Sequence, residues 1–126
     1  MLPDANEILP RLWIGTPASC DAARGQGFIC VCVLEQPHHP DCLHFRILND
    51  GGKAEIARVR LAGQLIDWNW NNQRGILIHC GGGIERSPLV VAMWMSQRFF
   101  MTLDEAYDWI KQRRPQAEDR RHWLIG

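Results

Sequence analysis

Apolar runs along the chain predict an alternation of short strands and helices. Segments 28–34 and 76–78 are continuously apolar and rich in β-branched residues, which is typical of strands covered on both faces. Residues 7–15 predict two short strands around a Pro-Arg turn, and alternation along 44–47 predicts another strand. This order of elements favours an α/β fold, in which helices flank a central, mainly parallel β-sheet.

Helices are expected between and after these strands, over residues 17–26, 54–72, 88–100, 103–113 and 118–124. In segment 54–72 the apolar positions recur at steps of three and four residues. The segment 88–100 is strongly apolar, so we expect it to be the central buried helix. Ligands of such folds bind at the carboxyl ends of the strands.

The stretch between strand 76–78 and helix 88–100 carries the candidate chemistry. It consists of His79, Cys80, Gly81, Gly82, Gly83, Ile84, Glu85, Arg86, Ser87 and Pro88. Successive backbone N–H groups in a glycine-rich turn can converge into a nest that binds anions. The start of the next helix adds unpaired donors and the positive end of its dipole. The stretch therefore suits a phosphate dianion and favours the thiolate form of Cys80.

Individual side chains of this stretch suggest separate roles. As a thiolate, Cys80 is a strong nucleophile toward phosphorus. Arg86 offers a planar fork of donors that matches two phosphate oxygens. We expect Ser87 to donate a hydrogen bond to the departing sulfur, and His79 to orient the loop by bonding to backbone. Glu85 is expected at the pocket rim, where it tunes substrate choice or pairs with a cationic group.

The order His79-Cys80, five residues, then Arg86-Ser87 resembles the signature of the cysteine-dependent protein tyrosine phosphatases. The flanking pattern is most similar to their dual-specificity subgroup, and the glycine at position 83 also matches. The resemblance implies a protein tyrosine phosphatase-like fold, with one catalytic domain over residues 1–126. It also implies hydrolysis of phosphomonoesters through a phosphocysteine intermediate.

The same resemblance implies a general acid on a loop roughly thirty residues before the cysteine, where Asp50 lies. Two glycines, 51 and 52, follow it and would let the loop move. Such an acid protonates the leaving group, typically contributes about 100- to 10,000-fold, and can then activate water. Asp41 is the second candidate. The alternative for Asp50 is an ordinary turn, in which its side chain bonds to its own backbone.

The loop also bears on the substrate. Residues 81–85 include no Lys or Arg, which argues against highly charged phosphoinositides. We expect a phosphorylated protein, carrying phosphotyrosine, phosphoserine or phosphothreonine, or a small aryl phosphate. Other possibilities are a phosphoinositide, an RNA 5′ phosphate or a small metabolite as substrate, a phosphate-binding module without turnover, and a rhodanese-like sulfurtransferase.

Composition sets the remaining expectations. The 126 residues carry a formal net charge of zero, so neither a nucleic acid nor a membrane is expected as a partner. The first residues do not resemble a signal peptide, and five cysteines suggest reduced thiols, so we expect a cytoplasmic protein. We expect Cys30 and Cys32 to pack in the core, although either could approach Cys80 as a resolving thiol.

No cofactor and no metal site are expected. Several potential ligands gather in and after the segment 35–42, namely His38, His39, Asp41, Cys42 and His44. Their spacing matches no common ligand pattern, so we interpret the histidines as solvated loop residues.

Overall fold

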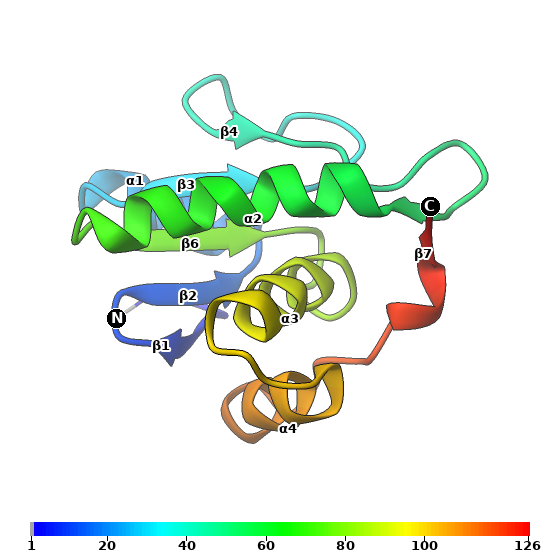
Figure 1. The fold of residues 1–126 in the computed structure, drawn as a ribbon. Coiled ribbons are helices and arrows are strands. Elements are labelled where there is room, and N and C mark those ends of the chain that lie inside the picture. The colour runs from blue at the N-terminus through cyan, green and yellow to red at the C-terminus, as the bar shows by residue number, and fades with distance from the viewer. Residues whose placement is uncertain (1) are drawn as a thin grey trace.

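A five-stranded sheet forms the centre of the computed structural model, which describes residues 2–126 (Figure 1). The strands of this sheet are β1 (Asn6–Leu9), β2 (Leu12–Gly15), β3 (Ile29–Cys32), β4 (Leu43–His44) and β6 (Ile76–His79). Their order is β1-β2-β6-β3-β4. Strands β2, β6, β3 and β4 are parallel, while β1 is antiparallel to β2. The expected mainly parallel sheet is confirmed.

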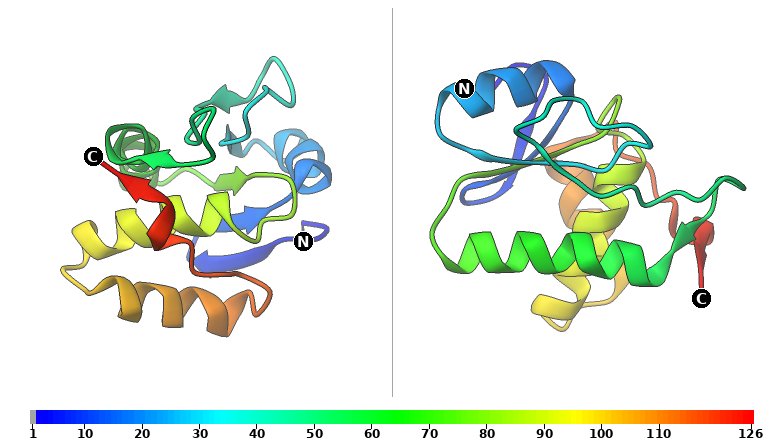
Figure 2. Two further views of the ribbon diagram at one scale, coloured as in Figure 1. Left: turned by 90° about the vertical axis from the view of Figure 1, so that its right-hand side faces the viewer. Right: turned by 90° about the horizontal axis from the view of Figure 1, so that it is seen from above.

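Helices cover both faces of the sheet (Figure 2). They are α1 (Pro17–Gly25), α2 (Ile56–Asn71), α3 (Arg86–Arg98) and α4 (Leu103–Arg113). Helix α1 lies on one face, and the other three lie on the opposite face. Along residues 2–126 we find no helix with the length and apolar character needed to cross a membrane.

Two helices begin at capping boxes that the sequence encodes locally. The side chain of Thr16 accepts a hydrogen bond from the backbone N–H of Ser19, and the side chain of Ser19 accepts one from the backbone N–H of Thr16. Thr102 and Glu105 form the same reciprocal pair at the start of α4. Each box satisfies two backbone donors that a helix start leaves unpaired.

The sequence misplaced several element boundaries. The strand expected over 44–47 is limited to β4, and α3 begins two residues before the expected position. The first two residues of the expected helix 54–72 form β5 (Ala54–Glu55) instead. The expected last helix, 118–124, is a 3-10 turn (Arg121–Trp123) followed by β7 (Leu124–Ile125). Strands β5 and β7 pair in parallel, and this long-range pairing has no local sequence signal.

The sheet separates two apolar clusters. The larger one includes apolar residues of α2, α3 and α4 and also contains Cys80. The smaller one includes residues of α1 together with Cys20, Cys30, Cys32 and Cys42. Alternation along the strands therefore places Cys30 and Cys32 in the cluster of α1, apart from the one that holds Cys80. Both pack in the core as expected, and all five cysteines are free thiols.

Candidate active site

The candidate loop connects the carboxyl end of β6 to the start of α3. Strand β6 ends at His79, Cys80 follows, and α3 begins at Arg86. Cys80 is only 1% exposed, and Ser87 is fully buried in the first turn of the helix. The nucleophile, guanidinium and hydroxyl expected from the sequence thus lie on one strand-loop-helix unit.

Polar groups around the sulfur favour its ionised form. Burial raises the pKa of the Cys80 thiol, but the hydroxyl and backbone N–H of Ser87, the charge of Arg86 and the N–H of Gly83 together lower it more. The net pKa lies below the ordinary value. The Ser87 hydroxyl has no hydrogen-bond partner among the described residues, so it is free to donate to the sulfur. A lowered pKa is the property that a cysteine nucleophile needs.

Arg114, which follows α4, holds the loop from the side opposite to solvent. It is 1% exposed. Its Nε donates to the carbonyl of Gly83 at 2.8 Å, and its Nη2 donates to the carbonyl of Gly82 at 2.9 Å. In a trans peptide the N–H points away from the carbonyl, so the N–H groups of residues 83 and 84 are turned away from this guanidinium. The contact of the Gly83 N–H with the sulfur agrees with this orientation.

Gly83 is the loop position where a side chain has no room. Its φ is +64°, in the left-handed region that favours glycine. A Cβ there would lie 2.7 Å from Arg114 Nη2 and 2.7 Å from the carbonyl oxygen of Gly15. The glycine therefore permits both the turn and the close approach of the guanidinium.

The guanidinium of Arg86 forms an ion pair with Glu35, a carboxylate that we did not identify from the sequence. Its Nη1 donates to Glu35 Oε1 at 2.7 Å and to Oε2 at 2.5 Å. Glu35 lies three residues after β3, whose carboxyl end is at the same sheet edge as that of β6. The guanidinium also lies over the loop, because a Cβ on Gly81 would be 3.5 Å from Arg86 Nη2. An incoming phosphate would compete with Glu35 for these donors.

The second carboxylate near the loop, Glu85, is held at its margin. Arg120 Nε donates to Glu85 Oε2 at 2.8 Å and also pairs with Glu118. The backbone N–H of Glu118 donates to the carbonyl of Ile84 at 2.8 Å. Glu85 thus has the cationic partner that we considered for it.

The two acid candidates lie away from the loop. The carboxylate of Asp50 is 97% exposed and accepts a hydrogen bond from Arg46 Nη2 at 2.7 Å. Asp41 is also exposed, and its carboxylate is 3.9 Å from His39 Nδ1. Across residues 2–126, neither carboxylate makes a hydrogen bond or ion pair with the stretch 79–88. In the turn after Asp50, it is the Asn49 side chain that accepts from the backbone, at Gly51 and Lys53.

His79 lies in the core at the end of β6. It is fully buried, and neither ring nitrogen has a hydrogen-bond partner within the described chain. The role in orienting the loop stays a prediction: burial has the largest effect on the pKa of the ring and lowers it, but the backbone of Cys80 is close enough to raise it by a smaller amount. Burial lowers its pKa to about 4, so the imidazole is neutral at pH 7. Strand alternation explains its position, since His79 and Leu77 face the α1 side of the sheet.

The sequence carries weak signals for the roles of Glu35 and Arg114, which we did not recognise. Glu35 directly follows an apolar strand segment at the sheet edge where ligands bind. Arg114 lies four residues after Ile110, in line with the buried face of α4. A charged residue at a core position indicates a buried polar partner.

Comparison with known proteins gives a consistent picture. The family model of the dual specificity phosphatase catalytic domain matches residues 32–125. Human dual specificity protein phosphatase 2 is 35% identical over 118 residues, which cover 86% of this chain. The match spans only 37% of that relative's length. Protein-tyrosine-phosphatase IBR5 of Arabidopsis thaliana is 42% identical over 43 residues, covering 34% of this chain and 17% of the relative.

Solved structures share the fold. Tk-PTP, in the crystal structure of its active form, has a TM-score of 0.79 and 25% identity, over 98% of this chain and 92% of that one. Human DUSP28 has a TM-score of 0.76 and 18% identity, over 98% of this chain and 89% of that one. The second likeness, at this low identity, concerns the fold alone.

Proposed function

This chain belongs to the dual-specificity phosphatase family, and we propose that it hydrolyses phosphate monoesters on proteins through a phosphocysteine intermediate. The observation that carries the proposal is the placement of buried Cys80 directly after β6, with Arg86 and Ser87 in the first turn of α3, an arrangement that lowers the pKa of the thiol. Burial alone would keep the thiol protonated, so the surrounding donors are arranged to favour the anion.

In the first step, the Cys80 thiolate attacks phosphorus and forms an S–P bond while the P–O bond to the leaving group breaks. Arg86 and the loop N–H groups bind the phosphoryl oxygens, where negative charge must be stabilised. Asp50 gives its proton to the leaving oxygen. Its loop must move toward the sulfur for this, and Gly52, whose φ is +74°, lies within that loop.

In the second step, water attacks the phosphocysteine. Asp50, now a carboxylate, takes a proton from this water, the S–P bond breaks, and inorganic phosphate forms. Ser87 donates to the departing sulfur and stabilises it as a thiolate. The same contact that lowers the pKa of Cys80 thus makes it a better leaving group.

Glu35 takes the place of a substrate phosphate at Arg86. Its carboxylate accepts from Arg86 Nη1, one of the guanidinium nitrogens that phosphate oxygens would otherwise use. Binding of a phosphate ester therefore exchanges one anion for another at the same guanidinium. The guanidinium of Arg86 therefore has an anionic partner before and after the exchange.

A phosphorylated protein remains the favoured substrate. The loop residues 81–85 carry no Lys or Arg, and the side chain of Glu85 places a negative charge near the loop. This arrangement disfavours ligands that carry several phosphates, and it suits a single phosphorylated side chain or a small aryl phosphate.

Hydrolysis of p-nitrophenyl phosphate by freshly reduced protein tests the proposal. The parent should turn over, whereas Cys80→Ser should show no turnover and keep its affinity for phosphate or vanadate within about 3-fold. Cys32→Ser, a substitution of a buried cysteine in the other core cluster, is the matched control and should remain active. Unchanged activity of Cys80→Ser excludes a cysteine nucleophile.

A phosphate-binding module without turnover is the second candidate. The observation that favours it is Asp50, which points into solvent at 97% exposure and pairs with Arg46. Phosphate binding by reduced parent protein, without hydrolysis of p-nitrophenyl phosphate at any pH from 5 to 8, would select this candidate.

A further inference from the structure

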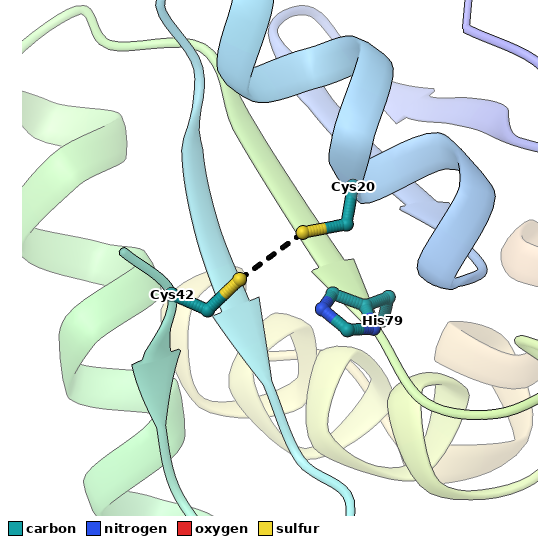
Figure 3. Close-up of side chains that lie close together, drawn as sticks. All are labelled: Cys20, Cys42 and His79. Carbon is teal, nitrogen blue, oxygen red and sulfur yellow. Dashed lines mark hydrogen bonds between the residues drawn. The ribbon is translucent and has the colours of Figure 1, made fainter. Parts of the chain in front are cut away.

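Three potential metal ligands converge beside the candidate active site (Figure 3). They are Cys20 on α1, Cys42 just before β4, and His79 at the end of β6. Their ligand atoms all lie within 4.8 Å of one another, and all three residues are buried. The two sulfurs are 3.1 Å apart.

The surroundings of His79 are a second, independent observation that points to a ligand. Both of its ring nitrogens are buried and have no hydrogen-bond partner across residues 2–126. A buried imidazole without a partner is unfavourable, because it loses its bonds to water and gains none. A ligand next to it would provide the missing partner.

We propose that Cys20, Cys42 and His79 bind one zinc ion. Thiolate sulfur and imidazole nitrogen are the donors that zinc prefers, at about 2.3 Å and about 2.0–2.1 Å. Two sulfurs on a tetrahedral zinc lie roughly 3.8 Å apart, so the two side chains here need to separate by less than an ångström. As the ion binds, each thiol releases its proton to solvent, and two thiolates neutralise the charge of the ion.

We assign the fourth ligand position of the zinc ion to His38. Its ring meets the ring of His79 edge to face, with centroids 5.5 Å apart. Its Nε2 now bonds to Asp21 at 3.1 Å, and it lies within 4.8 Å of the Cys20 sulfur. A rotation of this partly exposed side chain away from Asp21 would complete four-coordination, as structural zinc sites require.

The charged neighbours of the cluster are compatible with this ion. Arg24 Nη1 lies 2.9 Å from the Cys20 sulfur, where it can donate to a thiolate that is also bound to zinc. Asp21 pairs with the same guanidinium at 2.9 Å, so the arginine adds no net charge. A zinc ion with two thiolates is neutral as well.

A disulfide between Cys20 and Cys42 is the competing outcome. It would bond the two sulfurs and leave both nitrogens of His79 without a partner, whereas zinc engages all three residues. The ion would also link α1 and the segment before β4 to the residue next to Cys80. Metal binding would thereby anchor the strand end from which the candidate phosphate loop begins.

The test uses the full chain with Cys80→Ser, which removes the active-site thiol as a competing ligand. Reduced, metal-free protein is titrated with zinc chloride by calorimetry, and with cobalt(II) as a spectroscopic probe of tetrahedral thiolate coordination. We expect one ion per chain and thiolate-to-cobalt absorption bands. Cys20→Ser and Cys42→Ser should each weaken zinc binding at least about 100-fold. Cys30→Ser, buried in the same cluster, is the matched control and should change it less than about 3-fold.

A second measurement does not require the Cys20→Ser and Cys42→Ser variants. Zinc should protect Cys20 and Cys42 of the Cys80→Ser protein from alkylation, as mapped by peptide mass spectrometry, and leave the alkylation rates of Cys30 and Cys32 unchanged. Absence of stoichiometric zinc, protection of a different pair, or a Cys20–Cys42 disulfide that persists in the reduced preparation overturns the proposal.

Discussion

Arg86 and Glu35 form an ion pair between the candidate phosphate loop and the segment that follows β3, in which Arg86 Nη1 lies 2.7 and 2.5 Å from the two carboxylate oxygens. Both side chains keep some exposure to solvent, at 21% and 36%. The pair therefore contributes modestly to stability, of the order of 1 kcal/mol. A contact of this strength can yield to a phosphate.

Removing the charge of Glu35 should strengthen phosphate binding. Glu35→Gln leaves Arg86 without an anionic partner, so we expect the inhibition constant for inorganic phosphate or vanadate to fall about 3- to 10-fold, since such a pair is worth about 1 kcal/mol. Inhibition of p-nitrophenyl phosphate hydrolysis provides the measurement. Glu55→Gln removes a carboxylate that pairs with Arg58 instead and should have no effect. Equal affinity in Glu35→Gln and parent contradicts competition at Arg86.

Ser87 should set the acidity of the Cys80 thiol. Ser87→Ala removes the largest group that favours the thiolate, so the pKa of Cys80 should rise. The pH midpoint for inactivation by iodoacetamide, which reacts with the thiolate, should therefore shift upward. Since the parent pKa is lowered, parent protein reacts at pH values where the variant is still protonated. A midpoint that does not move shows that Ser87 has no influence on the sulfur.

Asp50 should matter most for poor leaving groups. Asp50→Asn should lower kcat for an alkyl phosphate about 100-fold or more, because an alkoxide needs a proton to leave. The decrease for p-nitrophenyl phosphate should be several-fold smaller, since nitrophenolate leaves more easily. Asp41→Asn tests the other carboxylate and should leave both rates near those of the parent. Equal decreases for both esters in Asp50→Asn point to a different acid.

Arg114 should support both stability and phosphate binding. Arg114→Met leaves the carbonyls of Gly82 and Gly83 without their donors, so the free energy of unfolding should fall by about 2–4 kcal/mol. Urea denaturation measures this change. In the fraction that folds, the KM for p-nitrophenyl phosphate should rise while the pH midpoint for alkylation of Cys80 shifts upward.

Arg113→Met is the matched control for that substitution. The guanidinium of Arg113 lies 3.4 Å from the centre of the Trp109 ring, away from the loop. Its removal should change the free energy of unfolding by less than about 1 kcal/mol and leave KM unchanged. Similar losses in the two variants contradict a specific role for Arg114.

The strand-loop-helix unit was predictable from sequence because its signals are local. A continuous apolar strand, three glycines and an apolar helix lie within 76–100, and the structure follows that order. The capping box at Thr102 is equally local and fixed the start of α4 correctly. In such segments, neighbouring residues decide the conformation.

Contacts between distant segments were not predictable in this way. Arg114 reaches Gly83 across 31 positions, and Arg86 reaches Glu35 across 51. The cluster of Cys20, Cys42 and His79 likewise comes from three distant segments, so ligand spacing along the chain gave no indication of it. Tertiary packing decides these contacts, and one sequence does not specify which charges it will join.

The two-stranded sheet of β5 and β7 has a consequence for the proposed acid. Ala54 pairs with Leu124 and also bridges to Leu48, so both ends of the segment 49–53 are tied together. Asp50 lies within this segment, whose two ends are held together next to the C-terminal strand β7. If Asp50 is the acid, its movement toward the sulfur is limited by the pairing of β5 with β7. Shortening β7 should then loosen the segment 49–53 and alter proton transfer, with no direct change in the candidate phosphate loop.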